Sequence, residues 1–218
     1  TEGVDYMFLA TCKGFLNHKE ELSVTKSDES HEYVLQFPLA SITAPVLIDN
    51  IFYDFDKATL RPESTAALDE LVKLLGENPN VTIELSAHCH YKGSAQYNKL
   101  LAQRRAESVV AYLTSKGIAR DRLSPVGYGK EKPKTIRKKL TEKYDWLKEG
   151  DVLSEEFIQK LDKAKQEICN QLNRRTEFSV LRTTYGLFDK EGKPSKQPAK
   201  TKKPSSANKD QKEDFYIN

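Results

Sequence analysis

The stretch that decides the fold is 84-ELSAHCHYKGSAQYNKLLAQRRAESVVAYLTSKGI-118. Its first residues continue an alternation of apolar and polar side chains that begins at Val81, which is typical of a half-buried strand. A polar turn, HCHYKGS, follows. Apolar side chains then recur on one helical stripe: Ala102, Ala106, Val109, Val110 and Leu113. Because Gly117 suits the position after a last helical turn, the stretch predicts a strand, a turn and a long amphipathic helix.

Strand and helix signals continue to alternate on both sides of this stretch. Upstream, Ile51–Phe55 is predicted as a strand and residues 62–76 as a helix, with Pro62 at its first turn. Downstream, we expect a strand at residues 123–128, a helix over 154–170 and a closing strand over 177–183. The order β-α-β-α-β-α-β predicts an α/β fold, an α+β sandwich in which a mixed sheet has helices packed on it.

The two ends of the chain differ from this middle part. Residues 1–45 hold three short apolar runs, YMFLA, YVLQF and PLASI, which predict a short N-terminal β segment. Residues 187–218 are rich in Lys, Pro and Ser, and such a composition cannot bury enough surface to offset the entropy of ordering. We therefore divide the chain into an N-terminal segment (1–45), a main domain (46–186) and a flexible tail (187–218).

Charge and composition argue against several classes of protein. The net charge is +3, but the tail alone has eight Lys and five acidic residues, so residues 1–186 are balanced. A nucleic-acid-binding domain usually has a basic face on its folded part, so no nucleic-acid partner is expected. No apolar run approaches the ~20 residues that span a bilayer. The first residues, TEGVDYMFLATCKGF, do not read as a leader, so we expect any targeting signal or lipid anchor upstream.

Signatures of catalysis and of metal binding are missing. The sequence has no Gly-x-Ser-x-Gly, no His-Glu-x-x-His and no phosphate-binding glycine-rich loop. Cys12, Cys89 and Cys169 form no CxxC pair, so structural zinc is not expected. His88 and His90 would share one face of a strand and could ligate zinc or copper, but no third ligand is visible. We therefore expect neither an enzyme nor a bound cofactor or metal.

Four ordered blocks resemble the OmpA-like C-terminal domain family. They are IFYDFDKATLRPES (51–64), the stretch 84–118, LSPVGYGKEKP (123–133) and NRRTEFSVL (173–181). The second block is similar to the family signature GHTDxxGxxxYNxxLSxxRAxxVxxYL. The resemblance implies the family's fold, a mixed sheet with packed helices, and its function, non-covalent and non-catalytic binding of cell-wall peptidoglycan.

The family's ligand is the free end of diaminopimelate in the stem peptide. That end is a zwitterion, so a pocket needs an anionic group, a cationic fork and backbone donors such as those at a helix start. Arg105 matches the family's carboxylate-binding Arg; its structural alternative is a surface ion pair with Glu107 or Asp69. The other positions that the resemblance assigns to ligand binding are Phe55, Asp56, His90, Gly93, Tyr97, Asn98 and Leu101.

One position departs from the family pattern: Cys89-His90 stands where the family has Thr-Asp. A neutral His cannot hold an ammonium by charge, and a protonated His would repel it. Three interpretations stay open. The pocket takes another stereoisomer or diamino acid, with the His lone pair accepting a hydrogen bond; or Asp54 or Asp56 supplies the negative charge; or wall binding is weak or lost. Asp56 has a turn-capping role as its structural alternative.

Several matched residues also have purely structural interpretations. For Tyr97 and Asn98 these are packing and local hydrogen bonds. Arg174 and Arg175 match a pair that supports the sheet edge near the pocket in the family, but a solvated basic pair would have the same sequence.

Residues 134–172 form an insertion that the shortest family members lack. It is predicted to add one or two helices, which Trp146 and Leu147 would pack onto the body of the domain. The insertion resembles that of OmpA-like lipoproteins of the Bacteroidetes, among them the PorE type of the type IX secretion machinery. Residues 1–45 resemble the end of a carboxypeptidase-regulatory-like domain.

Together these resemblances imply a periplasmic, outer-membrane-associated domain. We expect it to anchor an outer-membrane or secretion assembly to the cell wall, with peptidoglycan and other envelope or secretion-system proteins as partners. The alternative is an OmpA-like scaffold that has lost wall binding and docks only protein partners.

Overall fold

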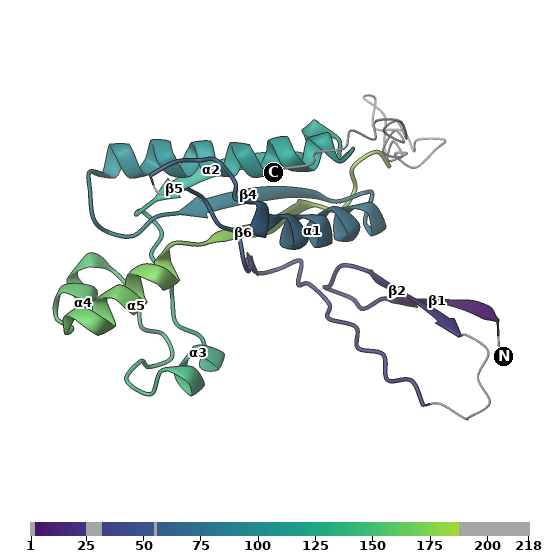
Figure 1. The fold of residues 1–218 in the computed structure, drawn as a ribbon, viewed down its shortest axis with the longest axis horizontal. Helices are drawn as coiled ribbons and strands as arrows, with labels where there is room; N and C mark the ends of the chain where they lie inside the picture. The colour runs from purple at the N-terminus through teal and green to yellow at the C-terminus, as the bar shows by residue number, and fades with distance from the viewer. Residues whose placement is uncertain (1–2, 25–31, 55, 188–218) are drawn as a thin grey trace, which may run out of the picture.

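The structure, a computed structural model, describes residues 3–24, 32–54 and 56–187 (Figure 1). Phe55 and the predicted tail beyond residue 187 lie outside the described residues. The main domain contains β3 (Val46–Ile48), α1 (Thr65–Glu77), β4 (Thr82–His88), α2 (Ala95–Ser115), β5 (Leu123–Gly129), α3 (Lys138–Lys143), α4 (Glu155–Gln159), α5 (Lys163–Asn173) and β6 (Thr176–Arg182). An N-terminal hairpin consists of β1 (Val4–Ala10) and β2 (His18–Val24).

The sheet of the main domain has the strand order β3-β6-β4-β5. The β4–β5 pair is parallel, while β6 runs antiparallel to both β3 and β4. The predicted β-α-β-α-β-α-β order and mixed sheet are therefore confirmed, with the helices of the insertion forming the third α segment. No helix in the described ranges combines the length and hydrophobicity that a membrane crossing needs.

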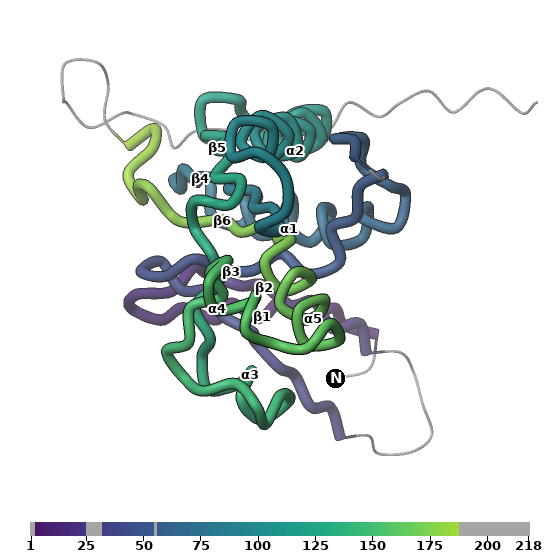
Figure 2. The backbone as a smooth tube through the Cα atoms, turned by 90° about the vertical axis from the view of Figure 1, so that its left-hand side faces the viewer, coloured from purple at the N-terminus to yellow at the C-terminus, as the bar shows by residue number. Residues whose placement is uncertain are grey.

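Helices α1 and α2 cover one face of the sheet. Their apolar stripes meet the inward side chains of the strands in one core that includes Leu68, Leu75, Ile83, Leu85, Val109, Leu113, Leu123 and Phe178. Because side chains alternate along a strand, the polar residues of β4 lie on the opposite face. That face is turned away from α2 and toward α3–α5 (Figures 1 and 2).

The contact between α2 and β5 is unusually close. A Cβ placed on Gly127 would lie 2.1 Å from the backbone nitrogen of Gln103, and one on Gly129 would lie 2.8 Å from that of Lys99. The Gln103 side chain then completes the contact, since its Oε1 accepts from the Gly127 N–H at 2.8 Å and its Nε2 donates to the Pro125 carbonyl at 3.3 Å. Only glycine permits this approach of two backbones.

The strand predicted at Ile51–Phe55 is wrong. The first strand of the sheet, β3, ends at Ile48, and residues 51–54 hold only an isolated bridge between Tyr53 and Leu60. The reason is local: the Ser64 hydroxyl both accepts from the Phe52 N–H (2.8 Å) and donates to the Phe52 carbonyl (3.0 Å). These bonds occupy the backbone groups that a neighbouring strand would need.

The insertion forms three short helices, where the sequence predicted one or two. Ser154 caps α4 as expected, but the helix predicted over 154–170 is broken, because Asp162 caps a new helix by accepting from the Lys165 N–H at 2.9 Å. The sequence did not predict this break, because apolar side chains continue at helical spacing across it. Trp146 and Leu147 pack in a separate small core around Ile136, Leu153, Ile158 and Cys169, so they join the parts of the insertion to one another rather than to the main core as predicted.

The N-terminal segment is only partly β-structure. The YMFLA run lies in β1, but YVLQF (33–37) forms no strand, and PLASI contributes a single bridge from Ser41 to Phe15. The segment docks at the end of α1, where Leu16 enters the main core and the Asn78 side chain bonds both the N–H and the carbonyl of Asn17 at 2.9 Å.

We expect Gly127→Ala to lower the free energy of unfolding by about 3 kcal/mol or more, because the new methyl group collides with the backbone of α2. Urea denaturation followed by circular dichroism would measure the loss. Gly76→Ala is the matched control: nothing lies within 4 Å of a Cβ there, so it should be neutral or stabilise α1 by up to about 1 kcal/mol. Equal stability of the two variants would contradict the close-packing account.

Candidate functional site

A tight loop before α1 presents the first charged group of the candidate site. The Asp54 N–H donates to the Thr59 carbonyl (3.2 Å), and the Lys57 N–H donates to the Asp54 carbonyl (3.1 Å). Between them Asp56 has φ of 55°, in the left-handed region that Asp tolerates better than most residues. Such strain is held by its surroundings and is frequent at binding sites. The loop leaves the Asp56 side chain exposed.

A second turn, between β4 and α2, is built around predicted site residues with structural roles. Gly93 has φ of 90°, and the Asn98 side chain, buried beside it, donates to the Lys92 carbonyl at 2.7 Å. Ser94 caps α2 by accepting from the Tyr97 N–H at 3.1 Å. Gly93 and Asn98 therefore hold the turn in shape, as in the structural interpretation of Asn98.

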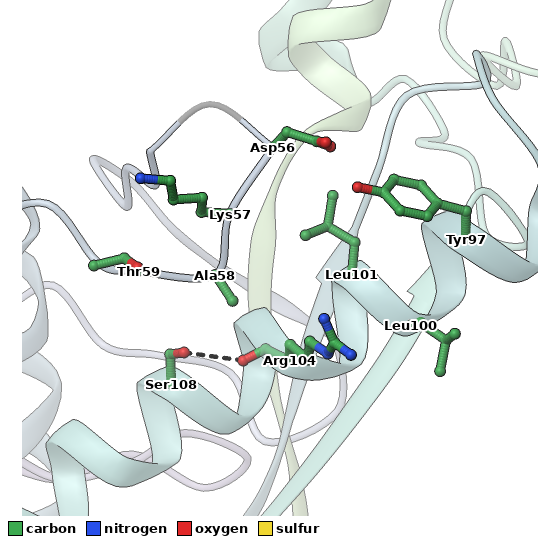
Figure 3. Close-up of a pocket in the computed structure, with 9 residues that line it drawn as sticks. All are labelled: Asp56, Lys57, Ala58, Thr59, Tyr97, Leu100, Leu101, Arg104 and Ser108. Carbon is green, nitrogen blue, oxygen red and sulfur yellow. Dashed lines mark hydrogen bonds between the residues drawn. The ribbon is translucent and has the colours of Figure 1, made fainter.

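A groove of about 560 Å³ lies between the Asp56 loop and one stripe of α2 (Figure 3). The Tyr97 hydroxyl points toward the Asp56 carboxylate, whose proximity raises the pKa of Tyr97 (Figure 3). Leu101 lies between them, and Arg104 follows along the helix (Figure 3). The full lining is Asp56, Lys57, Ala58, Thr59, Tyr97, Leu100, Leu101, Arg104 and Ser108. The groove thus combines a carboxylate, a guanidinium and an apolar floor.

Arg105, the residue that the sequence favoured most, does not line this groove. Its Nε donates to the Lys57 carbonyl at 3.0 Å, and its guanidinium lies 4.8 Å from the centre of the Tyr53 ring. The predicted ion pairs with Glu107 or Asp69 do not form; Asp69 instead pairs with Lys116 at 3.0 Å. Arg105 therefore ties the Asp56 loop to α2 beside the groove.

Tyr53, the ring beneath Arg105, ties the loop to the sheet. Its hydroxyl is 3.3 Å from that of Thr176 and 3.4 Å from the Arg105 carbonyl. Burial raises the pKa of Tyr53, since the charged phenolate would lose its solvation. The ring thus forms a neutral aromatic platform for the guanidinium.

His90 and Cys89 lie at the end of β4, near Arg105. The Cys89 N–H donates to the Gly129 carbonyl at 2.8 Å, and burial raises the pKa of the Cys89 thiol, partly offset by Arg105. His90 is half-buried, and its Nδ1 has no hydrogen-bond partner among the described residues. His90 does not line the groove, so the groove's negative charge comes from Asp56.

Sequence reasoning missed six lining residues of the groove: Lys57, Ala58, Thr59, Leu100, Arg104 and Ser108. A signal was present for the helical ones. Tyr97, Leu101, Arg104 and Ser108 recur at spacings of three and four, which places them on one stripe of α2. Leu100, 54% exposed beside this stripe, also indicates a contact surface, which the family pattern alone did not reveal.

His88 turns away from this site, onto the open face of the sheet. Its side chain is only 3% exposed, its ring stacks on Tyr128 with centroids 5.4 Å apart, and its Nε2 lies 3.6 Å from the Glu177 carboxylate. Burial, together with the nearby Arg175, lowers the pKa of His88 to about 4. No group of three or more His, Cys, Asp or Glu residues suited to a metal ion occurs within the described ranges.

Arg174 and Arg175 take separate roles beside β6. Arg174 pairs with Glu167 at 2.8 Å on the surface, while Arg175 pairs with Glu177 at 2.8 Å and is largely buried. The Arg175 carbonyl also accepts from the His88 N–H at 2.9 Å. Arg175 therefore supports the sheet edge, as the family pattern implies, and Arg174 is the solvated member of the pair.

A small α/β domain with an open, charged groove and no catalytic constellation is suited to binding. Residues 52–145 match the model of the OmpA family. This part of the chain, less than half of its length, is therefore similar to the OmpA family, and the match agrees with the expectation of a non-enzymatic protein.

Curated relatives align with this part of the chain. The peptidoglycan-associated lipoprotein of Rhizobium meliloti (strain 1021) is 36% identical over 88 residues, which is 40% of this chain and 50% of that protein. Outer membrane protein A of Escherichia fergusonii is 41% identical over 91 residues, which is 41% of this chain and 37% of that protein. The chain therefore spans half or less of the length of these relatives. By their names, the first of these relatives is associated with peptidoglycan and the second lies in the outer membrane.

Among solved structures, the peptidoglycan-associated lipoprotein from Burkholderia pseudomallei aligns with a TM-score of 0.43 and 23% identity, over 60% of this chain and 87% of that one. A likeness at that level adds nothing to the sequence match.

We expect the low pKa of His88 to make the protein less stable in acid. The unfolded chain takes up a proton at His88 near pH 6.5, whereas the folded protein does so only near pH 4. In that window the unfolded state binds more protons, so the free energy of unfolding falls as pH falls, by up to about 3 kcal/mol in all. Urea denaturation at pH values across the window would measure the slope.

His88→Gln provides the control for this prediction, since it keeps a polar side chain without the titration. The variant should lose less stability than the wild type between pH 6.5 and pH 4. Identical losses in the two proteins would show that other groups cause the acid sensitivity.

Proposed function

We propose that the groove binds the zwitterionic end of diaminopimelate in the peptidoglycan stem peptide and so anchors an envelope assembly to the cell wall. The observation that carries the proposal is that the groove is lined by the Asp56 carboxylate, the Arg104 guanidinium and the apolar side chain of Leu101. A ligand ammonium would meet Asp56, and its neighbouring carboxylate would meet the guanidinium groups of α2. Asp56 would thereby replace the acid that the family has at the position of His90.

Arg105 has a supporting role in this proposal. Its Nε is already bonded to the Lys57 carbonyl and its plane rests on Tyr53, so the terminal nitrogens are the atoms left for a ligand carboxylate. A guanidinium held in one orientation loses less entropy when it binds a carboxylate fork. The neutral Tyr53 ring beneath it leaves its full positive charge available to the ligand.

The second candidate function is a scaffold domain without wall binding. Two observations favour it: His90 stands where the family has an acid, and Arg105 is already engaged by the loop. In that case the OmpA fold would serve only to dock protein partners, and substitutions in the groove would leave wall binding unaffected because none exists.

We further propose that the envelope assembly anchored by this chain is a type IX secretion complex. This chain would be its PorE-type anchor. The support is the helical insertion over 134–172 and its resemblance to that of lipoproteins of the Bacteroidetes. Co-purification of secretion components with the tagged chain, compared with a chain that lacks residues 134–172, would test this part separately.

Sedimentation with purified peptidoglycan sacculi tests wall binding. We expect the wild type to pellet and Arg105→Ala to bind about tenfold to a hundredfold more weakly, because a charge-assisted contact is lost. Arg182→Ala, an exposed Arg at the far end of β6, is the matched control and should pellet like the wild type. A wild type that stays in the supernatant with sacculi of both common cross-link chemistries would support the scaffold function instead.

A second pair of variants tests which residue supplies the negative charge that contacts the ligand ammonium. Asp56→Asn should reduce binding of a diaminopimelate stem peptide about tenfold, because a charge pair is lost at equal size, whereas Asp54→Asn should change it less than about twofold. Titration calorimetry would measure both, with the meso and the L,L forms of diaminopimelate as competitors. Unchanged binding by Asp56→Asn combined with a loss in His90→Ala would assign the ammonium contact to His90.

A further inference from the structure

A second hollow, of about 960 Å³, lies between the open face of the sheet and the insertion. It shares no lining residue with the groove at Asp56. Its floor is formed by side chains of three strands: Glu84, Ser86, His88, Tyr128, Glu177 and Ser179. Helices α3–α5 lie on this side of the sheet, away from α2 (Figures 1 and 2). The hollow is therefore a separate candidate site that the insertion creates.

The hollow has a surplus of positive charge. Seven basic and three acidic residues line it. The deeper cations Lys134 and Arg175 share one carboxylate, that of Glu177, at 3.4 and 2.8 Å. At the rim, no carboxylate in the described part of the chain lies within ion-pair distance of Arg137, Lys139 or Lys143. These three side chains come from α3 and the residue before it, and their charge is left for a ligand.

His88 supplies an unsatisfied polar group at the bottom of the hollow. It is more than nine-tenths buried, and neither ring nitrogen has a hydrogen bond of ordinary length within the described residues. Its nearest polar neighbours are the Glu177 carboxylate at 3.6 Å and the Lys132 backbone. A buried polar group without a partner is costly, and a ligand that reaches it would recover that cost. The neutral ring can donate from one nitrogen and accept at the other.

Apolar side chains border the same hollow. Leu47 of β3 is 41% exposed and Phe52 is 44% exposed, and both line it together with Leu140 and Val152. The volume is at the upper end of the ~300–1,000 Å³ typical of ligand pockets, so a single phosphate or sulfate would leave most of it empty. A flat membrane surface cannot reach His88, because that residue is buried within the concavity.

We propose that this hollow binds an acidic segment of a partner protein that also carries an apolar side chain. Its carboxylates would pair with the rim cations Arg137, Lys139 and Lys143, and the apolar side chain would pack on Leu47 and Phe52. A backbone or side-chain polar group would bond to His88. The insertion would thus give the domain a protein-docking site on the face opposite its wall-binding groove.

Fluorescence anisotropy with a labelled peptide that alternates Glu and Leu tests this proposal on the full chain. We expect the double variant Arg137→Glu, Lys139→Glu to bind about tenfold more weakly or worse, since two charge pairs become repulsive. Lys138→Glu is the matched control: it is exposed on the same helix but does not line the hollow, so it should change binding less than about twofold.

Two further readouts separate the proposal from its alternatives. The ring signals of His88 should shift when the peptide binds, and Arg105→Ala should leave peptide binding unchanged, since that residue is not part of the hollow. Equal effects of Lys138→Glu and the double variant would overturn the proposal, because they would indicate unspecific charge attraction. Complete competition by millimolar inorganic phosphate, or equal binding of a Gln–Leu peptide, would overturn it as well.

Discussion

The close contact between α2 and β5 is the constraint on which the site depends. Gly127 and Gly129 let the backbone of the helix rest on the strand, and this fixes both the height and the rotation of α2 over the sheet. The rotation decides which stripe of α2 faces the core and which faces outward. Tyr97, Leu101 and Arg104 line the groove because the opposite stripe, with Ala102 and Ala106, is buried against the sheet.

The groove itself joins two segments that are distant in sequence. Its helix side is rigid, but its loop side is held by a few contacts: Tyr97 with Asp56, Arg105 with the Lys57 carbonyl, and Arg105 with the Tyr53 ring. The same arginine therefore holds the loop at a fixed distance from α2 and is also a candidate ligand contact. This double role explains why charge alone cannot identify the residue that meets the ligand.

The sequence predicted the order of elements well because each signal was local. Periodic apolar residues in α2 and alternation in β4 reflect one buried face, which secondary structure alone dictates. It failed where a side chain redirected the backbone: Ser64 bonds Phe52 and removes a strand, and Asp162 starts a new helix inside a continuous apolar stripe. Such hydrogen bonds depend on tertiary placement, so periodicity does not report them.

The candidate site was predictable to a similar degree. The family pattern led to Asp56, Tyr97 and Leu101, which do line the groove. It also selected Arg105, whereas the neighbouring Arg104 lines the groove, because the rotation of the helix decides which of the two faces it. The hollow on the open face could not be predicted from the sequence. It forms between β4, β6 and an insertion that begins more than forty residues after β4.

The side chain of Gln103 has one more consequence. β5 lies at the edge of the sheet, and exposed edges invite strands of other molecules to add and form aggregates. Here Pro125 has no N–H to offer, and Gln103 occupies both the Pro125 carbonyl and the Gly127 N–H. The helix that carries the groove thus also shields this edge strand from pairing with a strand of another molecule.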